Sequence, residues 1–113
     1  MITGAHVMLN SSEPDAVRAI LGDVFEWRSV DAGDGWLIFA LPPAELAVHP
    51  ADAPQHELFL MCDDLDATIT ELREKGVQIK GEPESVGWGM RTTIVLPGDL
   101  EVGLYQPRHA TAI

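Results

Sequence analysis

Residues 6–16 and residues 57–67 share one pattern of hydrophobic and polar positions. In this alignment Leu9 matches Leu60 and Ala16 matches Ala67. Each copy begins with an apolar segment that favours a strand, continues with an acidic turn, and then has apolar residues at helical spacing. The chain is therefore predicted to contain an internal repeat.

Each copy of the repeat predicts one helix followed by three extended segments. The helical stripes are Val17, Ile20, Leu21 and Val24 in the first copy and Leu65, Ile69 and Leu72 in the second. The extended segments are roughly 27–31, 36–41 and 45–49 in the first copy, and 77–80, 90–96 and 101–106 in the second. With the apolar strand that precedes each helix, both copies are βαβββ units.

Two βαβββ units in one chain predict an α+β fold. Module one spans about residues 4–50, module two spans about residues 56–107, and the polar, proline-containing stretch between them is a linker. A unit of about 50 residues buries little surface by itself, so we expect residues 1–113 to form one domain. In this domain one helix backs each curved, mixed sheet, and the two sheets pair around a common core.

The composition limits the kinds of molecule that the protein is expected to bind. The net charge is −11, and no cluster of Lys and Arg offers a site for phosphates, so nucleic acid is not an expected partner. No apolar run is long enough to span a bilayer, so we expect no membrane segment and a cytoplasmic protein. The single cysteine, Cys62, excludes an intrachain disulfide and is expected to be a small buried apolar residue.

This arrangement resembles the vicinal oxygen chelate superfamily, which contains glyoxalase I, extradiol dioxygenases and bleomycin-binding proteins. The resemblance covers about residues 4–107. It is carried by His6 in the first strand, DDLDATITELREKG at 63–76, WGMR at 88–91 and PGDLEVGLYQP at 97–107. It implies that the sheets line a ligand cavity, that matching strand positions supply metal ligands, and that the protein is a homodimer.

The resemblance places the metal ligands at His6, Glu45 and Glu57, with Gly103 at the position of a fourth ligand. The family usually has a second histidine where Glu57 stands and a second glutamate where Gly103 stands. One imidazole and two carboxylates suit Ni, Mn, Fe or Zn, and we expect such an ion to be weakly bound or absent. Glu45 or Glu57 is the candidate catalytic base.

Gly103 lies in the last predicted strand, where glycine weakens the strand. In the register implied by the resemblance, a larger side chain would point into the cavity, so that glycine removes a ligand or leaves room for a bound group. Another register places Gly103 opposite Leu46. A bulge or crowded packing at Gly103 is the alternative explanation.

Strand aromatics and one strand cation are the candidate substrate-binding residues, although aromatic residues on strands are often only part of the core. With Gly103, they are Trp36, Phe59, Trp88, Arg91 and Tyr105. Two functions are consistent with these residues: a divalent-metal-dependent lyase or dioxygenase with a degenerate site, or a metal-independent protein that sequesters an antibiotic or metabolite. The acidic charge would suit a cationic ligand, although solubility is the more common explanation of such a charge.

Overall fold

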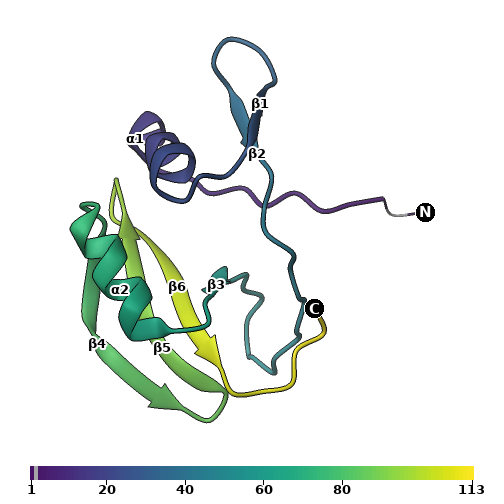
Figure 1. Cartoon of the computed structure of the whole chain (residues 1–113). Helices are drawn as coiled ribbons and strands as arrows, with labels where there is room; N and C mark the ends of the chain where they lie inside the picture. The colour runs from purple at the N-terminus through teal and green to yellow at the C-terminus, as the bar shows by residue number, and fades with distance from the viewer. Residues whose placement is uncertain (2) are drawn as a thin grey trace.

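The structure is a computed structural model that describes residues 1 and 3–113, and it confirms an α+β fold. The second half is a complete βαβββ unit (Figure 1). Its elements are β3 (Phe59–Met61), α2 (Leu65–Glu74), β4 (Gln78–Val86), β5 (Gly89–Leu96) and β6 (Leu100–Pro107). The sheet order is β3-β6-β5-β4, with β3 parallel to β6 and the other pairs antiparallel.

Helix α2 begins and ends where its sequence signals predict. The carboxylate of Asp64 accepts a hydrogen bond of 3.0 Å from the backbone N–H of Ala67, which satisfies one of the free donors of the first turn. Gly76 follows the helix with φ 83°, a conformation that glycine adopts without strain. The predicted apolar stripe of the helix is buried. Helix α2 therefore covers one face of the sheet.

The core lies between α2 and the sheet, and α1 (Pro14–Ala19) adds Val17 to it. The most deeply buried side chain is Ile94 of β5, which is 1% exposed. Its neighbours Val102 and Leu104 come from β6 and are each 3% exposed. Most of the buried apolar surface thus belongs to the second half of the chain.

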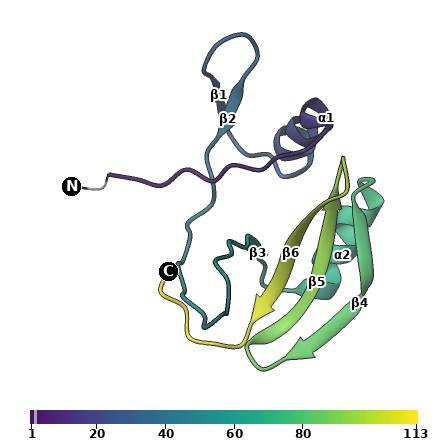
Figure 2. The ribbon, with the colours of Figure 1, turned by 180° about the vertical axis from the view of Figure 1, so that it is seen from behind.

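The first half contains less regular structure than predicted. Helix α1 runs into one π-helical turn, η1 (Ile20–Val24), and two short strands form a hairpin, β1 (Ser29–Asp31) with β2 (Leu37–Phe39). The predicted strands at 6–10 and 45–49 are not strands in the described structure, which corrects the sequence-based prediction. A strand requires a hydrogen-bonded neighbouring strand, and neither segment has one among the residues that the structure describes. Figure 2 shows the N-terminal segment and the hairpin standing clear of the four-stranded sheet.

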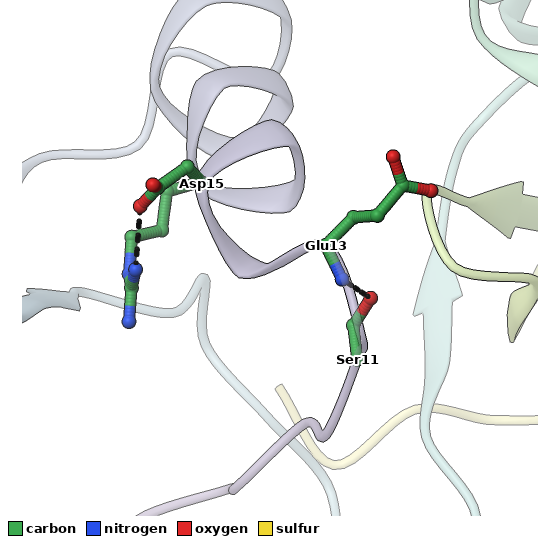
Figure 3. A network of polar contacts seen from close by, with 4 residues as sticks. Ser11, Glu13 and Asp15 are labelled. Carbon is green, nitrogen blue, oxygen red and sulfur yellow. Dashed lines mark hydrogen bonds and ion pairs between the residues drawn. The ribbon is translucent and has the colours of Figure 1, made fainter.

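The turn between β5 and β6 joins the two halves. The hydroxyl of Ser11 donates to the carbonyl of Pro97 at 2.6 Å, and the N–H of Gly98 donates to the carboxylate of Glu13 at 3.0 Å. Ser11 also accepts from the N–H of Glu13, and an ion pair of 2.9 Å links Asp15 to Arg18 (Figure 3). A side chain at Gly98 would collide with Ser11, so this close approach requires glycine.

No helix among residues 1 and 3–113 is long and apolar enough to cross a membrane.

Candidate functional site

The face of the four-stranded sheet that points away from α2 carries three aromatic rings and one cation. Phe59 of β3 lies opposite Gly103 of β6, and Arg91 of β5 lies opposite Tyr105 of β6. Residues directly opposite each other in a sheet project from the same face. Trp88, in the β4–β5 turn, completes the group. We call Phe59, Trp88, Arg91 and Tyr105 the aromatic face.

The three rings contact one another edge to face. Ring centroids are 5.5 Å apart for Phe59 and Trp88, 5.9 Å for Phe59 and Tyr105, and 5.0 Å for Trp88 and Tyr105. Interplanar angles are between 79° and 88°, which is a favourable electrostatic arrangement for aromatic pairs. Tyr105 is buried, whereas Trp88 is 37% exposed. Trp88 therefore presents aromatic surface to solvent on a platform fixed by the other two rings.

Arg91 lies between Trp88 and an acidic neighbour. The centre of its guanidinium is 5.9 Å from the centroid of the Trp88 ring, and its Nη2 is 3.5 Å from a carboxylate oxygen of Glu84. Glu84 is the cross-strand neighbour of Arg91 in the β4–β5 hairpin. The sequence analysis did not identify Glu84 as the partner of Arg91. A tight hairpin turn at Gly87 and Trp88 would have indicated this pair.

Gly103 is glycine because the ring of Phe59 lies across it. A Cβ at this position would collide with the Phe59 ring, and its φ is not in the left-handed region. Of the explanations that the sequence left open, the structure supports crowded packing. The space that a fourth metal ligand would need is filled by a side chain of the same sheet.

The C-terminal segment covers the Tyr105 side of the aromatic face. The hydroxyl of Tyr105 is 3.0 Å from Nε2 of His109, and Arg108 donates to the carbonyl of Val86 at 2.9 Å. Burial raises the pKa of Tyr105, and the nearby carboxylate of Glu45 raises it further, so this hydroxyl stays neutral. The carboxylate of Glu45 itself accepts a hydrogen bond from the N–H of Ala112. No pattern in the sequence indicated that the last residues contact Tyr105 and Glu45.

The residues predicted to bind metal lie in different surroundings. His6 lines a cavity in the first half, Glu45 contacts the C-terminal segment, and Glu57 is exposed. Within residues 1 and 3–113, no group of three His, Cys, Asp or Glu side chains is arranged to hold a metal ion. The donor set therefore does not fit a metal centre in this arrangement, and we derive no catalytic step for Glu45 or Glu57.

The cavity that contains His6 has a volume of about 370 Å³. Its walls come from both halves of the chain: residues 5–9, α1 and η1, residues 36–41, Leu60 of β3 with the preceding Leu58, Leu96 of β5, and Leu100 and Val102 of β6. Trp36, the sixth predicted substrate-binding residue, lines this cavity and is 56% exposed. The structure thus brings Phe59, Trp88, Arg91, Gly103 and Tyr105 together and places Trp36 elsewhere.

Cys62 should react slowly as a nucleophile. Burial raises the pKa of its thiol more than a hydrogen bond with Thr68 lowers it, and the carboxylates of Asp63 and Asp64 raise it further. We expect the folded protein at pH 8 to react with an aromatic disulfide reagent more slowly than the same protein in urea. Equal rates in the two states would show that the thiol is not protected.

Comparison with known proteins places the chain in a family. The model of the Glyoxalase/Bleomycin resistance protein/Dioxygenase superfamily matches residues 4–101. No curated protein matches the chain significantly. One similar solved structure is TnmS3, an antibiotic-binding protein from Streptomyces sp. CB03234. It is 24% identical, with a TM-score of 0.65, over 95% of this chain and 99% of that one.

A second similar structure is lactoylglutathione lyase from Agrobacterium tumefaciens, which is 17% identical with a TM-score of 0.66. The match covers 92% of each chain. At these identities the two structures show a shared fold, and the functions named for the two proteins differ. The family match extends over most of the sequence, so the chain belongs to the Glyoxalase/Bleomycin resistance protein/Dioxygenase superfamily.

Proposed function

We propose that this protein binds and sequesters a planar aromatic small molecule on its aromatic face. The observation that carries the proposal is the three-ring cluster of Phe59, Trp88 and Tyr105 with Arg91 beside it. A ligand ring that stacks on Trp88 would meet a rigid support, so little side-chain entropy would be lost on binding. Trp88 is 37% exposed, so part of its side chain is accessible for this contact.

The polar neighbours of Trp88 define the ligand further. Arg91 is a hydrogen-bond donor and the carboxylate of Glu84 is an acceptor. The two groups form an ion pair at 3.5 Å, and both side chains are exposed enough to meet a ligand as well. The net charge of −11 repels anions over the whole surface. We therefore infer a neutral or cationic aromatic molecule that carries polar substituents. An aromatic antibiotic meets this description, and one relative of the same fold is described as antibiotic-binding.

The alternative function is a divalent-metal-dependent lyase or dioxygenase, and one relative of the same fold is named as a lyase. That function needs His6, Glu45 and Glu57, or other donors, to converge on one ion. The described residues show no such convergence, so sequestration has the stronger support. We keep a homodimer and a cytoplasmic location as parts of the proposal.

Fluorescence titration with a planar acridine cation tests the proposal. We expect binding that quenches tryptophan emission, and we expect Trp88→Ala to weaken the affinity about tenfold, since stacking on one aromatic side chain contributes roughly 1–3 kcal/mol. Trp27→Ala is the matched control, because Trp27 packs against Phe25 at 5.1 Å and is not part of the aromatic face.

Two results would count against the proposal. The first is an unchanged affinity in Trp88→Ala, and the second is an equal loss in Trp27→Ala. Calorimetric titration with Ni²⁺, Mn²⁺ and Zn²⁺ tests the alternative function, a metal-dependent lyase or dioxygenase. Stoichiometric binding that disappears in His6→Ala would favour a metal-dependent enzyme.

A further inference from the structure

The last six residues of the chain lie along one side of the aromatic face. Strand β6 ends at Pro107, and residues 108–113 that follow it form no helix or strand. Figure 1 shows the chain turning after β6 toward the irregular segment between β2 and β3. All six residues are exposed. We call residues 108–113 the C-terminal strap.

The base of the C-terminal strap is fixed beside Trp88. The backbone N–H of Arg108 donates to the carbonyl of Trp88 at 3.0 Å. The guanidinium of Arg108 donates to the carbonyl of Val86 at 2.9 Å and to the hydroxyl of Ser85 at 2.6 Å. Three hydrogen bonds thus attach one residue of the strap to the end of the β4–β5 hairpin, so Arg108 can serve as the point about which the rest of the strap moves.

The ring of His109 lies on Tyr105 in the way that a ligand ring would. The two ring centroids are 5.8 Å apart and the rings are tilted by 31°, closer to parallel than the rings within the aromatic face. Nδ1 of His109 is 2.8 Å from the carbonyl of Ala110, which can only accept, so Nδ1 carries the proton. Nε2 therefore accepts from the Tyr105 hydroxyl at 3.0 Å. One imidazole occupies both the ring and the hydroxyl of Tyr105.

The tip of the strap is held by few contacts. The backbone N–H of Ala112 donates to the carboxylate of Glu45, in the segment between β2 and β3. The final side chain, Ile113, is 58% exposed, so no apolar anchor is buried there. Hydrogen bonds between exposed groups add little net stability, because water replaces them when they break. The strap beyond Arg108 should therefore open at a low cost in free energy.

A ligand on Trp88 would compete with His109 for space. The ring centroids of Trp88 and Tyr105 are 5.0 Å apart. A system of three fused rings is wider than this separation, so one that covers Trp88 also reaches Tyr105. Tyr105 is only 9% exposed, and His109 is one of the rings that contact it. The ligand and the closed strap cannot both occupy this position.

We propose that the C-terminal strap is autoinhibitory: His109 occupies the Tyr105 side of the ligand site in the free protein, and ligand binding displaces the strap about Arg108. This inference rests on the proposed function of the aromatic face. Because the closed strap blocks part of the site, the apparent affinity is lowered by the fraction of molecules in which the strap is open. After displacement, the Tyr105 hydroxyl is free to donate to or accept from a polar substituent of the ligand.

Fluorescence titration of the full chain with the acridine cation tests the strap. His109→Ala removes the competing ring, and Glu45→Ala removes the contact at the tip. We expect each variant to bind acridine about threefold to tenfold more tightly than wild type, since few hydrogen bonds hold the strap closed.

Two variants are matched controls for this titration. Glu74→Ala removes the same charge as Glu45→Ala, at an exposed position of α2. Thr111→Ala removes a hydrogen bond of 3.1 Å within the strap, from the Thr111 hydroxyl to the carbonyl of Ile113. Neither change touches the contacts with Tyr105 or Glu45, so neither variant should bind acridine more tightly than wild type.

Nuclear magnetic resonance relaxation of the wild type is the second measurement. The heteronuclear NOE of the backbone amides of residues 109–112 should fall when acridine saturates the protein, because the displaced strap moves freely. The value for Val102, in the core of β6, should stay the same. A purely structural role of His109 would not produce this change in the wild-type chain.

Three outcomes would overturn the autoinhibitory strap. If His109→Ala and Glu45→Ala bind no more tightly than wild type while Trp88→Ala still weakens binding, the proposed function stands and the strap does not inhibit it. A heteronuclear NOE that rises on binding would show that the strap closes over the ligand. If wild type and both strap variants fail to bind acridine, the proposed function and the strap are both wrong.

Discussion

Replacing Ile94 with alanine is expected to lower the free energy of unfolding by roughly 2–5 kcal/mol, the range for truncating a large buried aliphatic side chain. Ile94 is 1% exposed and lies on β5, with Val102 of β6 and Ile79 of β4 as its cross-strand neighbours. The lost methyl groups leave a cavity that the close-packed sheet and α2 cannot fill. Urea unfolding followed by circular dichroism measures the change.

Val30→Ala provides the contrast for this measurement. Val30 is 55% exposed on β1, and its truncation should change the free energy of unfolding by no more than about 0.5 kcal/mol. Both variants must be compared at one protein concentration, since association would add to the apparent stability. A loss below about 1 kcal/mol for Ile94→Ala would mean that the core does not lie where the structure places it.

The second half of the chain could be predicted because its signals are local. Asp64 at the start of α2, Gly76 after its end and the stripe of Leu65, Ile69 and Leu72 all lie within the segment that they organise. The turn at Pro97–Asp99 likewise fixes the β5–β6 hairpin through its own backbone angles. In this half, local preference and tertiary packing favour the same structure.

The first half could not be predicted to the same extent, because its strands depend on neighbours. Residues 45–49 alternate as a strand does, yet no strand among residues 1 and 3–113 pairs with them. The alternation of apolar and polar residues shows that a segment can form a strand. Whether it pairs with another strand depends on where the chain places it. Pro43 stands where the second copy has Gly98, and its ring cannot reproduce the positive φ of that glycine, so the chain takes a different path after residue 43.

The candidate site was predicted in part. Phe59, Trp88, Arg91, Gly103 and Tyr105 were selected as strand aromatics, a cation and a glycine, and the structure places them on one face of one sheet. The proposed metal ligands were carried over from a family pattern that this chain does not fully share. Their positions lie in segments outside the regular strands, so no local signal fixed the relative placement of these side chains.

Gly103 connects the packing of the sheet to the shape of the aromatic face. In an ordinary strand, alanine is more stable than glycine by roughly 0.5–1 kcal/mol, because glycine loses more backbone entropy on folding. At Gly103 a Cβ would collide with the Phe59 ring, so alanine should here be less stable than glycine. If Phe59 moves to relieve the collision, its contacts with Trp88 and Tyr105 must change as well.

We therefore expect Gly103→Ala to lower the free energy of unfolding by roughly 1–3 kcal/mol, as overpacking does elsewhere. In a Phe59→Ala background the ring is absent, and the same substitution should be neutral or stabilising. Urea unfolding of wild type, both single variants and the double variant should give a coupling energy of at least about 0.5 kcal/mol between the two positions. Additive effects, or a stabilising Gly103→Ala in wild type, would mean that Phe59 does not require glycine. In that case the other explanation, that Gly103 leaves room for a bound group, would be favoured.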